Sequence, residues 1–157
     1  MNNHARMLHL AEEVFAAHDD PTQLQVDPEV LEHLVDLHPA AVSEVADEDG
    51  PIAWVLLIPT TADLMEDFLT GQLTEQDLYL RTPTGVAYEA VYLCSAMVLE
   101  EHRRKGIAKR MTLDALAWLM KEHPIRALFC WPFTEEGSAF AQALAADLDL
   151  PLRIRPM

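Results

Sequence analysis

Apolar residues recur every three or four positions in two segments near the start of the chain. The first segment, residues 5–18, is predicted to form an amphipathic helix with an acidic outer face. The second is predicted to begin with Asp27 as its N-terminal cap and Pro28 as its first helical residue, where proline lacks an amide hydrogen that would be unpaired anyway. The pattern therefore predicts two helices before any strand.

From residue 40 the helical spacing gives way to two apolar runs separated by a polar turn. Residues 40–60 contain both runs, and the turn at residues 47–51 includes glycine and proline. Short runs rich in β-branched and aromatic residues on either side of such a turn are typical of a hairpin. We expect an antiparallel pair of strands here.

Helical spacing then returns in the segment that follows, residues 60–87. Thr60 with Asp63, and Thr74 with Asp77, have the three-residue spacing of capping pairs. Two short helices are predicted in this segment.

The second half of the chain alternates between strand and helix patterns. The predicted elements are a central strand at 88–99, a helix at 107–121, a buried strand at 125–133, a helix from its cap Thr134 through 146, and a last strand at 152–155. This order is typical of parallel crossovers. The predicted fold class is α+β with a mixed α/β sheet, in which an antiparallel hairpin is followed by parallel strand-helix-strand units with flanking helices, as one domain over residues 1–157.

Composition narrows the class of protein. The chain has 26 acidic and 11 basic residues, a net charge of −15, which disfavours nucleic acid and anionic membranes as partners. Since no apolar run approaches the length of about 20 residues that a membrane span needs, we expect a cytoplasmic protein. Cys94 and Cys130 are expected to be reduced core thiols, and His33 and His38 are expected to be surface residues with no metal site.

The charge is distributed unevenly along the chain. Residues 1–80 carry 17 acids and a single base, Arg6, whereas residues 81–157 carry nine acids and ten bases. Five of those bases fall within residues 103–110, at the junction between the predicted central strand and the helix after it.

Cations at a helix N-terminus are unfavourable unless an anion binds there, because the unpaired amides carry positive partial charge. Gly106 and Ala108 are small enough to let phosphate groups approach the backbone. The segment therefore predicts a site for a compact polyanion. The alternative is a solvated basic face balanced by Glu100, Glu101 and Asp114.

The run Arg103-Arg104-Lys105-Gly106-Ile107-Ala108 resembles the pyrophosphate-binding motif Q/R-x-x-G-x-G/A of the GNAT superfamily of N-acetyltransferases. Val98 matches the hydrophobic residue five positions before that motif, and the order of predicted elements is similar from about residue 40 onward. The resemblance implies a GNAT-like fold, with acetyl-CoA as co-substrate and no metal.

The resemblance also implies site residues. Backbone groups of Ala96, Met97 and Val98 would bind the acetyl and pantetheine arm. The other implied cofactor-binding residues are Arg103, Arg104, Lys105, Gly106, Ile107, Ala108, Lys109 and Thr134.

Two departures from the family concern the mechanism. The tyrosine that protonates the departing thiolate in the family is matched by Ala141, so water, Tyr88 or Tyr92 would take that role. Residues 60–87 form an insertion where the family has a short turn, and this insertion could shape an acceptor pocket, cover the site or build a dimer contact.

Glu89 is the candidate catalytic base, because some family members use a carboxylate on the central strand, about one position nearer the motif. The alternative is that Glu89 is an exposed acid at a strand end.

The predicted function is transfer of an acetyl group from acetyl-CoA to a primary amine on a small molecule or peptide, with a cationic acceptor favoured by the acidic first half. The alternatives are a regulatory protein that binds acyl-CoA without catalysis, and an interaction module whose basic patch binds an acidic partner. A homodimer is compatible with each.

Overall fold

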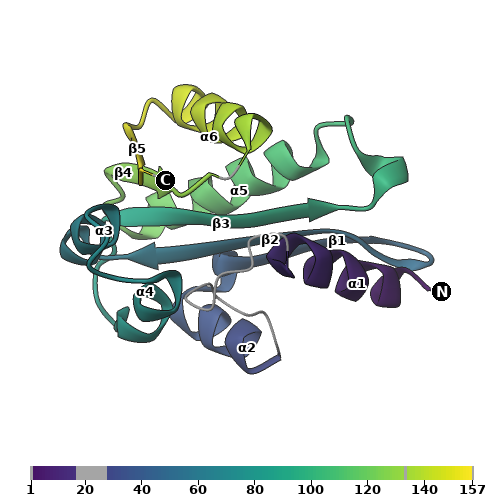
Figure 1. Ribbon diagram of the computed structural model, residues 1–157, viewed down its shortest axis with the longest axis horizontal. Helices are drawn as coiled ribbons and strands as arrows, with labels where there is room; N and C mark the ends of the chain where they lie inside the picture. The colour runs from purple at the N-terminus through teal and green to yellow at the C-terminus, as the bar shows by residue number, and fades with distance from the viewer. Residues whose placement is uncertain (1, 17–27, 133, 157) are drawn as a thin grey trace.

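The computed structural model describes residues 2–16, 28–132 and 134–156 (Figure 1). Two predicted features lie outside these residues: the end of the first helix, at residues 17 and 18, and the N-terminal cap of the second helix, Asp27. The helices and strands, with η for 3-10 helices, are α1 (Asn3–Ala16), α2 (Pro28–Leu37), η1 (Pro39–Ala41), β1 (Val42–Asp47), β2 (Gly50–Thr60), α3 (Ala62–Leu69), α4 (Glu75–Arg81), β3 (Ala90–Val98), η2 (Glu100–His102), α5 (Ile107–Glu122), β4 (Ala127–Cys130), α6 (Glu135–Leu148) and β5 (Leu152–Ile154).

The strands form one mixed sheet in the order β1-β2-β3-β4-β5. β1, β2 and β3 are antiparallel neighbours, whereas β3, β4 and β5 run parallel, which confirms the predicted fold class. The two crossovers place α5 and α6 on one face of the sheet, and α1, α2 and α4 lie on the other (Figure 1). Within the described residues, no helix is both long and apolar enough to span a membrane.

The buried face of α5 is largely as its spacing predicts. Met111, Ala115, Leu116 and Leu119 are buried against the sheet. Trp118 has the same helical spacing as these residues but is 46% exposed. Its indole makes a T-shaped contact with the ring of His38 (5.1 Å between ring centres).

His38 corrects a prediction, because its side chain is buried rather than on the surface. α2 ends at Leu37, and His38 caps η1 by accepting a hydrogen bond from the amide of Ala40 at Nδ1 (3.0 Å). Nε2 lies 2.5 Å from a carboxylate oxygen of Glu122 at the end of α5, an interaction that lowers the pKa of Glu122. In the part of the chain that is described, no group of histidine, cysteine and carboxylate side chains is placed to bind a metal.

The two short helices of the insertion lie between β2 and β3. Thr74 and Asp77 form the predicted capping box at the start of α4. The prediction that Thr60 caps α3 is wrong by one residue, because Thr61 is the cap. Thr60 instead ends β2, where its buried hydroxyl is 2.8 Å from that of Thr82.

Candidate functional site

Strands β3 and β4 pair over a short length and then separate. Their parallel register runs from Ala90 opposite Ala127 to Tyr92 opposite Phe129, whereas β3 continues to Val98. Beyond the last pair a cavity of about 710 Å³ lies between the strands, bordered by α5 and α6. The sheet therefore has a gap at the carboxyl ends of two parallel strands.

β3 carries a bulge at the inner end of this cavity. Leu56 pairs with Ser95 and Leu57 pairs with Leu93, so Cys94 is the extra residue with no partner on β2. Cys94 also lines the cavity. The bulge thus lies where the cavity meets the last paired residues of the two parallel strands.

The edge of β3 that faces β4 is unpaired along the cavity, and we call it the open edge. From residue 93 to 98 this strand pairs with β2 on one side, and no described strand pairs with its other side. Backbone groups on an unpaired strand edge can hydrogen-bond an extended ligand that lies alongside. The edge can therefore hold a linear molecule containing amide groups.

The other end of the cavity is the N-terminus of α5. Gly106 precedes this helix with a left-handed backbone (φ 75°), and no side chain caps the helix among the described residues. A Cβ added at Gly106 would meet nothing within 4 Å, and the residue lines the cavity. Arg104 is also left-handed (φ 66°), which is uncommon for a residue with a side chain. The first amides of α5 are thus accessible to an anion in the cavity.

The bases of this segment are mostly without acidic partners. Arg103, Arg104, Lys105 and Arg110 form no ion pair within the described residues, whereas Lys109 lies 3.0 Å from Asp147 of α6. Positive charge at a helix N-terminus, where most of the bases form no ion pair among the described residues, favours binding of a polyanion.

The structure brings together most of the site residues that the sequence analysis named. Those that line the cavity are Ala96, Val98, Arg103, Arg104, Gly106, Ile107, Ala108, Lys109 and Thr134. Met97 and Lys105 do not line it. Met97 is 2% exposed, because alternation along β3 directs its side chain into the core.

α6 forms the facing wall. Thr134 caps it by accepting a hydrogen bond from the amide of Gly137 (2.9 Å), and both residues line the cavity. Ala141 is also part of this wall and brings no proton donor to it.

The two tyrosines considered as substitute acids do not line the cavity. The hydroxyl of Tyr88 donates to the carbonyl of Pro83 (2.7 Å), and that of Tyr92 donates to the carboxylate of Glu75 (2.5 Å). Burial raises the pKa of both phenols, and the Glu75 carboxylate adds to this effect for Tyr92. Neither phenol is placed to protonate a group in the cavity.

Glu89 lies just before β3, at the end of the strand far from the phosphate-binding segment. Its carboxylate forms an ion pair with Arg126, and it does not line the cavity. The catalytic role of Glu89 stays a prediction, and its position does not support that role.

Cys94 and Cys130 are free thiols, and both line the cavity in addition to packing in the core. Burial raises the pKa of Cys130 to about 11, and burial together with the Glu75 carboxylate raises that of Cys94 well above its usual value. Both thiols therefore remain protonated at neutral pH and are poor nucleophiles.

Two features beside the cavity are not predicted by the sequence. Glu75 of the insertion is 3% exposed and accepts a hydrogen bond from Tyr92, two residues before the bulge. The guanidinium of Arg155 lies over the rings of Trp131 and Phe68 (4.2 and 4.6 Å), and Trp131 lines the cavity. No local sequence signal marks either contact, because the partners are far apart in the chain.

Residues 6–148 match the sequence profile of a family described as the acetyltransferase (GNAT) family. Among solved structures, an aminoglycoside N-acetyltransferase AAC(6')-Iy in complex with CoA has a TM-score of 0.43 and 15% identity, covering 77% of this chain and 87% of that one. A ribosomal-protein-alanine N-acetyltransferase from Brucella melitensis biovar Abortus 2308 also has a TM-score of 0.43, with 18% identity, covering 88% of this chain and 82% of that one. No curated protein matches the chain in sequence.

Proposed function

Because this chain belongs to the acetyltransferase (GNAT) family, we propose that it transfers an acetyl group from acetyl-CoA to a primary amine, using the cavity between β3 and β4. The main support for the proposal is that two features lie at opposite ends of the same cavity. One end is the N-terminus of α5, which no described side chain caps and where most of the bases have no acidic partner among the described residues. The other end is the bulged, open edge of β3. A molecule with phosphates at one end and an amide-containing arm at the other fits this arrangement.

In the proposed binding mode, the pyrophosphate of CoA lies against the first amides of α5, near Arg103, Arg104 and Lys105. The pantetheine arm follows the open edge of β3 from Val98 toward the bulge. The thioester then lies near Cys94, where the cavity meets the paired part of the sheet.

The transfer forms a bond between the amine nitrogen and the acetyl carbon, and it breaks the bond from that carbon to sulfur. A backbone amide on the open edge of β3 would polarise the thioester carbonyl. The acceptor ammonium must first lose a proton, and the departing thiolate must gain one. Since the phenols of Tyr88 and Tyr92 bond to other groups, we propose that water protonates the thiolate.

We propose that the acceptor amine reaches the thioester from the side of the sheet that carries the insertion. CoA would occupy the side of α5 and α6, and the cavity wall at Trp131 is contacted from the opposite side by Arg155 and Phe68 of α3. The 17 acids of residues 1–80 favour a cationic acceptor. A cytoplasmic location and a homodimer stay predictions.

A second candidate is a protein that binds acyl-CoA without transferring the acyl group. It is favoured by the absence of a phenol from the described cavity wall, where Ala141 occupies the position expected for one.

Thiol release from acetyl-CoA, measured with a panel of polyamines, aminated small molecules and peptides with a free N-terminus, separates these candidates. The proposed function predicts release that depends on an amine. CoA binding with no release for any amine would favour the second candidate, and no binding of CoA or acetyl-CoA would contradict both.

A further inference from the structure

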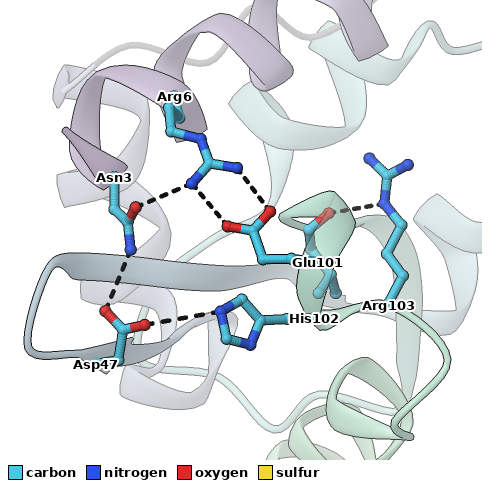
Figure 2. Close-up of polar contacts among 7 residues, drawn as sticks. Asn3, Arg6, Asp47, Glu101, His102 and Arg103 are labelled. Carbon is cyan, nitrogen blue, oxygen red and sulfur yellow. Dashed lines mark hydrogen bonds and ion pairs between the residues drawn. The ribbon is translucent and has the colours of Figure 1, made fainter. Parts of the chain in front are cut away.

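Five side chains form a closed series of polar contacts beside the phosphate-binding segment, as Figure 2 shows. Arg6 donates to both carboxylate oxygens of Glu101 (2.7 and 2.6 Å) and also to Asn3 (3.2 Å). Asn3 donates to Asp47 (3.2 Å), whose other oxygen lies 3.6 Å from Nε2 of His102. Glu101 and His102 are consecutive, so the series closes on itself. We call these five residues the clamp.

The clamp joins three segments that are distant in sequence. Asn3 and Arg6 come from the first turn of α1, Asp47 ends β1, and the other two residues belong to η2. Asn3 is 6% exposed. The loop that leads into the phosphate-binding segment is thus fixed to α1 and to the turn between β1 and β2.

Gly50 permits this close approach of α1 to the hairpin turn. Its backbone is left-handed (φ 118°), and a Cβ added there would lie 3.2 Å from Cβ of Asn3. A larger residue would strain the turn and push α1 away from it.

The residues that follow the clamp belong directly to the cavity. His102 and Arg103 line it, and Nε of Arg103 donates to the carbonyl of Val98 (2.9 Å). Figure 2 shows the Arg103 side chain directed away from Glu101, on the other side of the loop. Holding Glu101 against α1 therefore holds Arg103 on the side of the cavity.

The ion pair of Arg6 and Glu101 also affects the charge near the phosphate-binding segment. Glu101 is an acid two residues from Arg103, and its bond to Arg6 lowers its pKa to about 2, so it is ionised at neutral pH. An unpaired carboxylate at this place would repel a bound polyphosphate. Arg6 is the single base among the first 80 residues, and it neutralises this acid.

We propose that Arg6 and Glu101 are positioning residues for the CoA phosphates: Arg6 fixes the loop through Glu101 and cancels the acid's charge. This inference rests on the proposed function. It assigns to α1 a role in binding the donor, in addition to covering the sheet.

The test is the dissociation constant of CoA for four proteins: wild type, Arg6→Ala, Glu101→Ala and the double variant. Arg6→Ala leaves an unpaired acid and a looser loop, so its affinity should fall about two- to fivefold, the order expected for a partly exposed ion pair. Glu101→Ala loosens the loop to the same extent but also removes the acid, so its affinity should fall less than that of Arg6→Ala. The double variant should resemble Glu101→Ala, so the second substitution restores affinity that the first removed.

Arg153→Ala is the matched control, because Arg153 forms a similarly exposed two-bond ion pair with Glu66 on another part of the surface. It should leave CoA affinity unchanged. Arg6→Gln is the alternative if Arg6→Ala does not fold. Unchanged affinity in both Arg6 variants would overturn the inference, as would losses in the double variant equal to or greater than those of Arg6→Ala. If the wild-type protein itself does not bind CoA, that result contradicts the proposed function and not the contacts of the clamp.

Discussion

The guanidinium of Arg155 lies 4.2 Å from the centre of the Trp131 indole ring, so the end of the chain contacts the wall of the cavity. The same guanidinium lies 4.6 Å from the ring of Phe68 in α3 and donates to the carbonyl of Leu73 (3.2 Å). Trp131 is thereby supported by the insertion between β2 and β3. Of the three roles that the sequence left open for this insertion, the contact favours shaping the acceptor side of the cavity.

Replacing Arg155 by Leu should impair binding of the acceptor and not of CoA. A cation–π contact of this kind contributes about 0.5–1 kcal/mol, so the acceptor KM should rise about two- to fivefold through looser placement of Trp131. Steady-state kinetics with acetyl-CoA and an active amine measure this. Arg155→Lys keeps the positive charge, so the acceptor KM should rise less than in Arg155→Leu. Arg153→Leu, two residues away and paired with Glu66, is the control. Equal losses of acceptor and CoA binding in Arg155→Leu would contradict this explanation.

Replacing Gly106 by Ala should weaken CoA binding by more than its effect on stability can explain. Gly106 lines the cavity, and a Cβ there would meet no protein atom within 4 Å. We expect this Cβ to displace a phosphate from the helix amides, a loss of about tenfold or more in affinity for hydrogen bonds to a charged group. The left-handed backbone (φ 75°) also makes Ala less stable there by about 1–2 kcal/mol.

Gly85 provides the control that separates these two effects. It has nearly the same φ (74°) and equally open surroundings, but it does not line the cavity. Gly85→Ala should lower the free energy of unfolding by a similar amount and leave the dissociation constant of CoA unchanged. If both variants lose CoA affinity to the same extent, the loop at Gly106 is not the phosphate site.

Glu89→Gln should leave the pH dependence of the reaction unchanged. Its carboxylate forms an ion pair with Arg126 and does not line the cavity, so we expect it to lie out of reach of an amine bound there. The pH–rate profile of kcat/KM for the acceptor measures this directly. Loss of the acidic limb in the variant would show that Glu89 is the base despite its position.

The pair of Arg6 and Glu101 should also give a defined dependence of stability on pH. The folded-state pKa of Glu101 is lowered from 4.5 to about 2, so the stabilisation is complete above the ordinary value and is lost as the pH falls toward 2. The difference in melting temperature between wild type and Glu101→Gln should therefore be constant from pH 5 to 7 and shrink as the pH is lowered from about 4.5. A difference that grows on acidification would contradict the assigned direction.

The features that the sequence predicted correctly depend on short-range patterns. The capping box of Thr74 and Asp77, the hairpin, and the small Gly106 before α5 each reflect a few neighbouring residues. The parallel crossovers follow from the order of strands and helices, because that order leaves few possible topologies.

The predictions that failed depend on contacts between distant parts of the chain. Thr60 has the spacing of a helix cap, but its bond to Thr82, 22 residues away, keeps it in β2. His38 was expected at the surface, yet its partner Glu122 lies 84 residues further along. Arg6 pairs with Glu101 across 95 residues, and no local pattern marks either of them as a partner of the other.

The most direct test of the whole account is the crystal structure of this protein soaked with CoA. We expect electron density for the pyrophosphate against the first amides of α5, beside Gly106 and Arg104, and for the pantetheine arm along the open edge of β3 toward Cys94. CoA bound at any other surface, with the cavity between β3 and β4 unchanged, would contradict it.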